Sequence, residues 1–365
     1  MLRHVYIHIP FCHRICPYCS FYKHKPGGTD MGAFVDAILR EIEFQSTRHE
    51  IVPRTIYLGG GTPSMLSTQH LSSLLAGIAA RLDLSQLEEW DLEANPMTFG
   101  KEKAAAMRDH GVTRVSLGVQ AMDDRTLETL GRDHSPDGAA QAFDILREAE
   151  LPSVNVDLMF AIPGQSLDVW RDCLTSIVGF EPDHISCYNL TYEEDTEFFE
   201  KLEAGTYHQD HDDDASFFTA AMDGLGAAGF EHYEISNYAR PGFKSVHNRA
   251  YWAGKDYLGI GPGAVSTVEG QRWKNRPDTA RYLVTDPADL PTEQEVIDAE
   301  AFRNERIALQ LRTADGLPKA LLTEEMIEQK VPTLIGEQLL HEDRHTIFLT
   351  RRGKLVADSV AGYLV

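Results

Sequence analysis

The stretch HIPFCHRICPYC, residues 8–19, joins an apolar run to a loop that carries three cysteines. The run over residues 5–11 predicts a β-strand, and the spacing of Cys12, Cys16 and Cys19 places three thiolates on the short loop that follows. Thiolates are soft ligands that suit an iron–sulfur cluster or zinc. A cubane has four irons, so three cysteines leave one iron free for a small chelating ligand.

Two other interpretations of these cysteines remain open from the residues alone. One is a zinc site with His13 or a distant residue as fourth ligand, and the other is three buried cysteines that bind nothing. Zinc sites more often combine two C-x2-C pairs, whereas this region has one. The spacing therefore favours the cluster.

Outward from this loop, strand-like runs recur about every thirty residues, with helix-like patterns between them. The further predicted strands cover residues 55–59, 90–94, 114–120, 154–160 and 184–190. This alternation is typical of βαβ units and predicts an α/β fold with a parallel sheet. The period fits either an incomplete (β/α) barrel or an open doubly wound sheet. Both architectures place reactive residues at the C-terminal ends of the strands.

Residues with chemical capability follow several of these strands. Gly59-Gly60-Gly61-Thr62-Pro63 follows the second strand, Glu93 ends the third, Gln120 ends the fourth and Asp157 lies in the fifth. Glycine lets a ligand approach the main chain closely. We therefore expect cysteines, glycines, carboxylates and an amide to meet at one rim of the sheet.

The cysteine spacing on a first βα loop, followed one βα unit later by GGGTP, resembles the radical SAM superfamily. That resemblance implies an incomplete (β/α)6 barrel, a [4Fe–4S] cluster held by Cys12, Cys16 and Cys19, and S-adenosylmethionine (SAM) on the open iron. The segments HIPFC, EANP, SLGVQ and DLMFAIPG narrow the resemblance to the branch of the oxygen-independent coproporphyrinogen III oxidases. By this resemblance the SAM-binding residues are Tyr6, Gly60, Gly61, Thr62, Glu93, Gln120, Arg132 and Asp157.

The chain departs from the oxidase pattern in two ways. Phe21 stands where the oxidase has a fourth cysteine, and Cys12 lies close to the first residue, where the oxidase has an extension. Both features resemble a family of heme chaperones on the same scaffold. The segment His247-Asn-Arg-Ala-Tyr251-Trp252 is similar to the heme-binding motif of that family. The resemblance implies that His247 is a heme ligand, with Tyr251 and Trp252 beside the macrocycle.

We therefore expect a heme chaperone that passes heme to an acceptor protein, such as a respiratory enzyme. The alternative is the oxidase itself, which decarboxylates porphyrinogen propionates. A third class, radical modification of nucleic acid, is disfavoured because 34 Lys and Arg against 56 Asp and Glu give a net charge of −22. No apolar run is long enough to cross a membrane, and the start lacks the features of a signal peptide. We expect a cytoplasmic protein with no integral membrane segment.

The rhythm changes after the sixth strand. We predict the partial barrel over residues 1–230, a connecting region rich in glycine and aromatic residues over 231–290, and a smaller α+β domain over 291–365. The last segment reads as helices followed by a hairpin of strands 345–349 and 354–356, which resembles a winged helix.

Other features have simpler interpretations. Asp212, Asp213 and Asp214, near His208 and His211, fit the acidic start of a helix better than a metal site. Cys173 and Cys187 are expected to be buried apolar residues. The glycines of 259–263 precede no βαβ unit, so they do not indicate a dinucleotide-binding loop.

Overall fold

Six parallel strands form the centre of the computed structural model, which describes residues 1–365 except the side chain of His211. The strands are β1 (Leu2–Ile9), β2 (Ile51–Gly60), β3 (Glu89–Ala94), β4 (Arg114–Gln120), β5 (Ser153–Phe160) and β6 (His184–Asn189). They pair in chain order, each in parallel with the next. All six strands predicted from the sequence are present, with ends that differ by at most a few residues.

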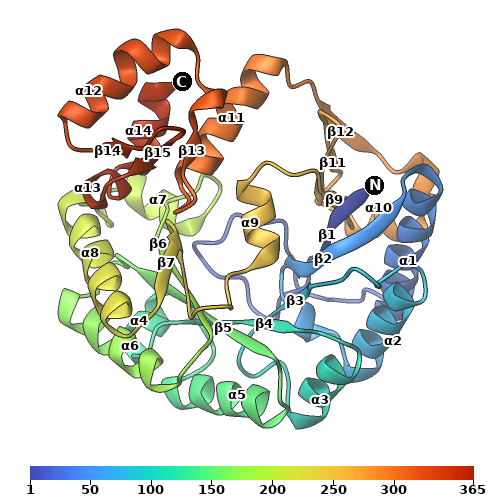
Figure 1. Ribbon diagram of the computed structural model, residues 1–365. Helices are drawn as coiled ribbons and strands as arrows, with labels where there is room; N and C mark the ends of the chain where they lie inside the picture. The colour runs from blue at the N-terminus through green and yellow to red at the C-terminus, as the bar shows by residue number, and fades with distance from the viewer.

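Helices between the strands cover the outer side of the curved sheet (Figure 1). They are α1 (Met31–Arg48), α2 (Thr68–Ala79), α3 (Lys101–Asp109), α4 (Asp124–Thr129), α5 (Pro136–Glu148), α6 (Leu167–Gly179), α7 (Glu197–Glu203) and α8 (His211–Ala227). Helix α1 buries Val35, Ile38 and Ile42 at helical spacing. Helix α5 begins after the N-cap Ser135 with Pro136 in its first turn, as predicted.

Elements from the middle of the chain extend the sheet at both edges. Strand β9 (Leu258–Ile260) pairs in parallel with β1, while β8 (Asn237–Ala239) and β7 (Glu231–Glu234) add antiparallel strands beside β6. The resulting order is β7-β8-β6-β5-β4-β3-β2-β1-β9. The two edges do not pair with each other, so the sheet is a partial barrel and the predicted fold class is confirmed.

Alternation along the strands separates an apolar outer face from a polar inner face. In β1, Val5, Ile7 and Ile9 pack in the core between sheet and helices. Their neighbours on the opposite face include His4, which bonds Thr55 of β2, and Tyr6, which stacks on Tyr57. Because successive side chains of a strand point to opposite faces, this polar set lines the interior of the barrel.

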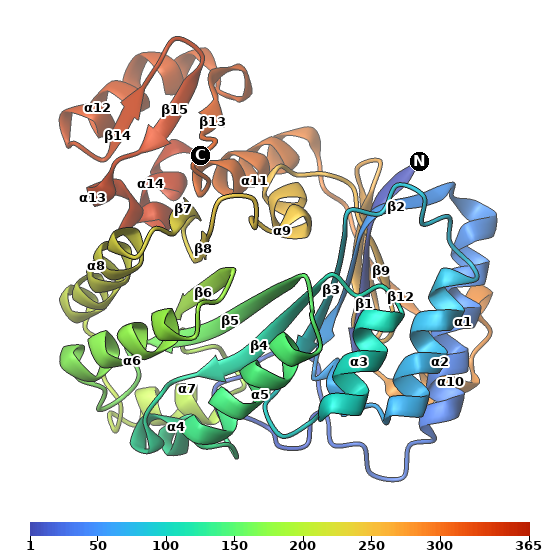
Figure 2. The same ribbon diagram turned by 60° about the horizontal axis from the view of Figure 1, so that its bottom comes forward.

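Helix α9 (Val246–Trp252) lies at the end of the barrel where the parallel strands begin (Figure 2). Its neighbour in the chain is a three-stranded antiparallel sheet of β10 (Val265–Val268), β11 (Gln271–Asn275) and β12 (Thr292–Glu295). The connection between β11 and β12 carries α10 (Thr279–Val284) and the short 3-10 turn η2 (Pro287–Asp289). The domain boundaries given above stay a prediction.

The C-terminal elements have a separate small core. They are α11 (Ala299–Leu311), β13 (Leu317–Pro318), α12 (Val331–Gly336), β14 (Leu340–Glu342), β15 (Thr346–Leu349), α13 (Arg351–Lys354) and α14 (Ala357–Leu364). Ile307, Leu334, Ile347 and Val360 are buried together in it. The strand order is β13-β15-β14.

The predicted hairpin of 345–349 with 354–356 is wrong in its second strand. β15 forms its hairpin with β14, which precedes it, and pairs with β13 on its other side. Thr350 accepts a hydrogen bond from the backbone N–H of Gly353 and so caps helix α13. A threonine followed by two arginines resembles a turn in sequence, but here its hydroxyl begins a helix.

Three smaller expectations are confirmed. Asp210 caps the acidic start of α8 and accepts from the backbone N–H groups of Asp212 and Asp213. The side chain of His211 lies outside the described residues. Cys173 in α6 and Cys187 in β6 are buried. The element after β9 is strand β10 and not an α-helix, so the glycines of 259–263 do not open the βαβ unit of a dinucleotide-binding loop.

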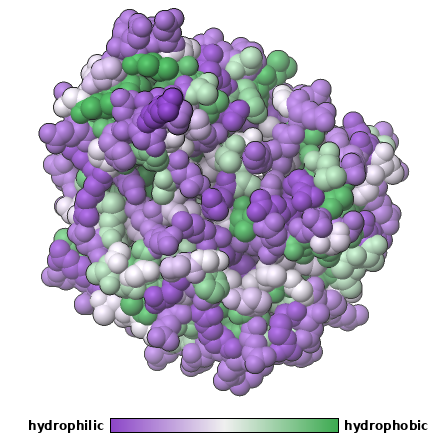
Figure 3. Space-filling view, viewed as in Figure 1, coloured by the Kyte–Doolittle hydropathy of each residue, from purple (hydrophilic) through white to green (hydrophobic). Residues whose placement is uncertain are grey.

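The described part of the chain contains no helix that is both long and apolar enough to cross a membrane. The face seen in Figure 3 is mainly hydrophilic, with scattered apolar patches. This surface agrees with the strongly negative net charge.

Candidate functional site

The three cysteines lie on the loop that leaves the C-terminal end of β1. Two backbone hydrogen bonds close this loop at its base, from the N–H of Cys12 to His24 and from the N–H of His24 to Pro10. Cys12, Cys16 and Cys19 are unpaired and half-buried. Burial raises the pKa of the Cys12 thiol to about 11, although a hydrogen bond from Thr62 acts in the opposite direction.

A continuous set of hydrogen bonds connects the cysteine loop to the ends of the next strands. The hydroxyl of Thr62 donates to Sγ of Cys12 at 3.7 Å, and Nδ2 of Asn95 donates to that hydroxyl at 3.1 Å. Arg132 then donates from Nη2 to Oδ1 of Asn95 at 2.7 Å and from Nη1 to Sγ of Cys16 at 3.6 Å. Side chains from three other loops therefore hold two of the cysteines in place.

The glycine segment at the end of β2 requires glycine at two positions. Gly60 has φ of +105°, and a Cβ there would lie 2.3 Å from the ring of His8. A Cβ on Gly61 would lie 2.7 Å from the backbone of Pro10. The N–H of Gly61 bonds the carbonyl of Ile9, and the N–H of Thr62 bonds that of Phe11. The segment is thus pressed against the start of the cysteine loop, as only glycine permits.

Glu93 lies at the same rim. Its Oε2 accepts from the N–H of Gly60 at 3.0 Å and its Oε1 from the hydroxyl of Tyr57 at 2.7 Å. Burial raises the pKa of Glu93 from 4.5 to about 7, partly offset by the bond from Tyr57. Tyr6 stacks on Tyr57, with ring centroids 6.0 Å apart. The carboxylate can therefore change its protonation state near neutral pH.

Asp157 and Gln120 complete the inner surface. Asp157 accepts from Ser116 and Asn155, both at 2.8 Å, and burial raises its pKa. Gln120 ends β4 with φ of +70°, at a register shift between Gly118 and Gln120. A positive φ at a residue other than glycine costs about 1–3 kcal/mol and is concentrated at functional sites.

His247 lies at the other end of the barrel. Glu89, the first residue of β3, accepts from the N–H groups of Val246 and His247 and from the hydroxyl of Ser245, so it caps α9. Nδ1 of His247 bonds the hydroxyl of Thr55 at 2.8 Å, and its ring centroid is 5.0 Å from that of Tyr57. The structure thus brings the cysteines, Thr62 and Arg132 together but separates His247 from them.

Burial lowers the pKa of His247 to about 4. The ring is therefore neutral at physiological pH. Among the side chains that the structure describes, none forms a hydrogen bond with Nε2 of this ring. A neutral imidazole with one nitrogen fixed and the other unpaired is the form that binds a metal.

The side chains around the cysteine loop fit an iron–sulfur cluster. Within the described residues, no three His, Cys, Asp or Glu side chains come close enough to hold one ion. Arg132, which contacts Cys16, also has a buried Nε without a hydrogen-bond partner. Cationic and hydroxyl donors beside the sulfurs suit a negatively charged thiolate cluster.

Sequence reasoning missed three residues that organise these two ends. Asn95 joins Thr62 to Arg132, Tyr57 joins Glu93 to the ring of His247, and Glu89 holds α9. Asn95 lies in the EANP segment and Tyr57 lies two residues before Gly59, so their position in the sequence beside predicted site residues could have identified them. Glu89 lies close to Glu93 in sequence but at the opposite end of strand β3, and only the tertiary structure brings it to α9.

Comparison with known proteins agrees with this geometry. The radical SAM superfamily model matches residues 6–176. Heme chaperone HemW of Lactococcus lactis is 34% identical, covering 97% of this chain and 95% of that protein. Heme chaperone HemW of Mycobacterium tuberculosis is 35% identical, covering 99% and 94%.

The solved coproporphyrinogen III oxidase of Escherichia coli has the same fold. It aligns with a TM-score of 0.85 over 100% of this chain and 90% of that one, at 19% identity. At that identity the likeness concerns the fold alone, whereas the full-length relatives establish the family. The chain belongs to the HemW family within the radical SAM superfamily, whose cofactors are a [4Fe–4S] cluster and SAM.

Proposed function

We propose that this protein is a heme chaperone that binds heme and transfers it to an acceptor protein. The observation that carries the proposal is the similarity, at 34% and 35% identity over nearly the full length, to relatives named as heme chaperones. Cys12, Cys16 and Cys19 would hold the cluster, and the iron without a cysteine would bind SAM. When bound, the reduced cluster supplies an electron that can cleave SAM to a radical.

Around that cluster the chain's own residues bind and orient. Thr62 and Arg132 donate to the cysteine sulfurs. Gly60 and Gly61 let a ligand approach the main chain, and ionised Glu93 accepts from the SAM amino group. Tyr6, Gln120 and Asp157 line the same interior and complete the SAM site.

At the other end, His247 is the heme ligand through Nε2. Its support is the neutral imidazole, held through Nδ1 by Thr55. A ligand with its pKa near 4 keeps binding iron in mildly acidic solution, where an ordinary histidine is protonated. The acceptor is a respiratory enzyme, and transfer takes place in the cytoplasm.

The test is a heme titration of anaerobically reconstituted protein, followed by absorbance. We expect His247→Ala to weaken heme binding at least about tenfold, the loss expected when a direct ligand is removed. The control is His110→Ala, which removes an imidazole from the outer α3 region. Heme binding that survives His247→Ala unchanged would remove this residue from the site.

The same protein preparation tests the alternative function, that of a coproporphyrinogen III oxidase. Coproporphyrinogen III, SAM and a reductant are added, and porphyrin products are analysed. We expect no decarboxylated product, and its appearance would overturn the chaperone proposal.

A further inference from the structure

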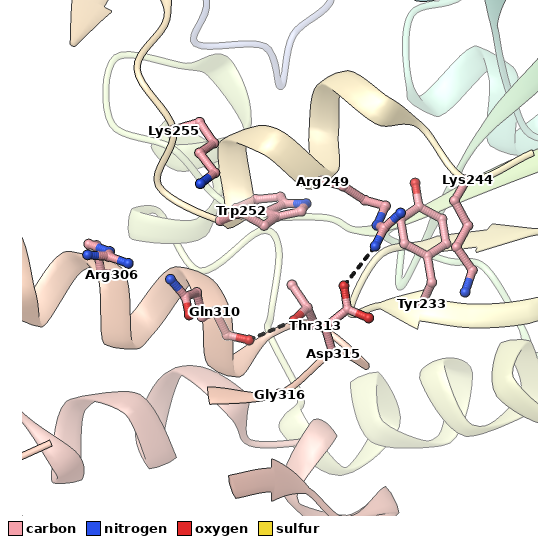
Figure 4. A pocket seen from close by; sticks show the side chains of 11 residues that line it. Tyr233, Lys244, Arg249, Trp252, Lys255, Arg306, Gln310, Thr313, Asp315 and Gly316 are labelled. Carbon is pink, nitrogen blue, oxygen red and sulfur yellow. Dashed lines mark hydrogen bonds and ion pairs between the residues drawn. The ribbon is translucent and has the colours of Figure 1, made fainter. Parts of the chain in front are cut away.

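A small pocket between α9 and α11 carries an unusual charge for this acidic chain. Its volume is about 200 Å³, and its lining includes Tyr233, Lys244, Arg249, Trp252, Lys255 and Arg306. Lys255 and Arg306 lie at one end of the pocket, and Lys244 and Tyr233 at the other (Figure 4). Four cations therefore surround a pocket in a protein of net charge −22.

Two of these cations already have anionic partners. Lys244 pairs with Glu231 at 2.7 Å, and Arg249 pairs with Asp315 at 3.0 Å. Within the part of the chain that the structure describes, neither Lys255 nor Arg306 forms an ion pair. The pocket therefore retains two positive charges without counter-charge.

Arg306 is held close to α9. Gly254 follows this helix with φ of +63°, and a Cβ there would lie 3.1 Å from Cγ of Arg306. The glycine thus lets the arginine side chain from α11 lie against the end of α9. Nε of Arg306 is buried and has no hydrogen-bond partner among the described residues.

Trp252 adds a third unused donor. Its indole nitrogen is buried without a partner among the described residues and lies at the end of the ring nearest Arg249 (Figure 4). The guanidinium of Arg312, which does not line the pocket, lies 5.0 Å from the centroid of the Trp252 ring and holds the indole in place by a cation–π contact. A buried donor without an acceptor is costly unless a ligand supplies one.

We propose that this pocket binds a ligand with two carboxylates on a short hydrocarbon skeleton. Lys255 and Arg306 neutralise the two negative charges, and the planar guanidinium matches the geometry of a carboxylate. Trp252 donates an additional hydrogen bond, and its ring and Ala253 supply apolar surface for the carbon skeleton.

Two sources can provide these carboxylates: a free dicarboxylic acid, or the paired propionates of a porphyrin. His247 faces Thr55 and Tyr57 of β2, whereas the pocket lies where α9 meets α11. The pocket is therefore distinct from the proposed iron ligand. Only the porphyrin source rests on the proposed function.

The experiment compares the full-length protein with Lys255→Gln/Arg306→Gln. A matched control, Lys101→Gln/Arg171→Gln, removes two exposed cations from the outer helices α3 and α6. Glutarate binding is measured by calorimetry. Heme and its dimethyl ester, whose propionates carry no charge, are titrated separately by absorbance. Circular dichroism establishes that each variant is folded, and Lys255→Gln alone provides a milder change at an exposed residue.

For a free dicarboxylate, we expect glutarate to bind the parent and the control, and to bind at least tenfold more weakly to the pocket variant. For a porphyrin source, the parent and control prefer heme over the ester at least tenfold, and the pocket variant loses that preference. Either result supports the pocket.

The inference is overturned if the pocket substitutions alter neither glutarate affinity nor the preference for heme over its ester. Absence of heme binding in every protein contradicts the proposed function instead, while the glutarate titration still decides the pocket.

Discussion

The two ends of the barrel are made from the same six strands but treat their polar groups differently. At the C-terminal end, half-buried thiols, a positive φ at Gln120 and the unpartnered Nε of Arg132 leave capacity for a ligand. At the N-terminal end, Glu89 caps α9 and forms an ion pair with Arg114. One end is arranged to receive the cluster and SAM, and the other fixes the helix that carries His247, the proposed heme ligand.

The rim with the cysteines can be separated from the rest of the molecule by mutation. We expect Cys12→Ala/Cys16→Ala/Cys19→Ala to abolish cluster assembly, so that reconstituted iron falls from about four per chain to less than about one. The cysteines lie on a loop, so the fold survives. Iron is measured after anaerobic reconstitution.

The matched control for the cysteines is Cys173→Ala/Cys187→Ala. These thiols are buried in α6 and β6, so their loss lowers the free energy of unfolding by about 1 kcal/mol per site while iron stays bound. Equal loss of iron in both variants would contradict the assignment of the cluster to the rim.

The N-terminal end depends instead on a buried ion pair. Nε of Arg114 lies 3.1 Å from Glu89 and 3.8 Å from Asp91, and its Nη2 donates to the carbonyl of Phe243 just before α9. Arg114→Met would leave two buried carboxylates without their cation. We expect a loss of about 3–5 kcal/mol in the free energy of unfolding, measured in urea.

An exposed ion pair serves as the comparison for Arg114. Lys101 pairs with Glu148 on the outer helices, and Lys101→Met is expected to cost at most about 1 kcal/mol. Both variants should assemble the cluster normally, because the substituted residues lie away from the cysteine rim. A similar cost for the two substitutions would refute the structural role given to this end.

Sequence alone could predict the cofactor rim better than the opposite end. Cysteine spacing, the glycine segment and the polar strand ends are local patterns, and the βαβ rhythm places them at one edge. Arg132 joins them through Asn95, Gly118 and Cys16, contacts that depend on how the loop between α4 and α5 folds back. The secondary-structure propensities of the residues do not specify how such a loop folds back.

The N-terminal end and the C-terminal hairpin were less predictable for different reasons. Glu89 and Ser245 are 156 residues apart in the chain, so no local pattern relates them. The predicted strand over residues 354–356 is absent because the hydroxyl of Thr350 caps a helix where the composition indicated a turn. In both cases a specific hydrogen bond decides the structure.

Tyr57 is the place where the two ends meet, and it provides the most subtle test. Its hydroxyl donates to Glu93, while its ring packs near His247. Tyr57→Phe removes that donor and is expected to cost about 1 kcal/mol in stability. It also raises the pKa of Glu93 further above 7, because the lost bond favours the carboxylate.

The sign of the pH dependence follows from this pKa. Between about pH 4.5 and 7 folded Glu93 keeps a proton that the unfolded chain has released, so its contribution to stability is lost as pH rises through that window. SAM affinity should rise as the pH increases towards 7, since the ionised carboxylate of Glu93 is the form that accepts a hydrogen bond from the SAM amino group. In Tyr57→Phe the midpoint of SAM affinity against pH should move upward, whereas Tyr363→Phe on the exposed face of α14 should leave it in place. A midpoint that is the same in all three proteins would show that Tyr57 does not link the two ends through Glu93.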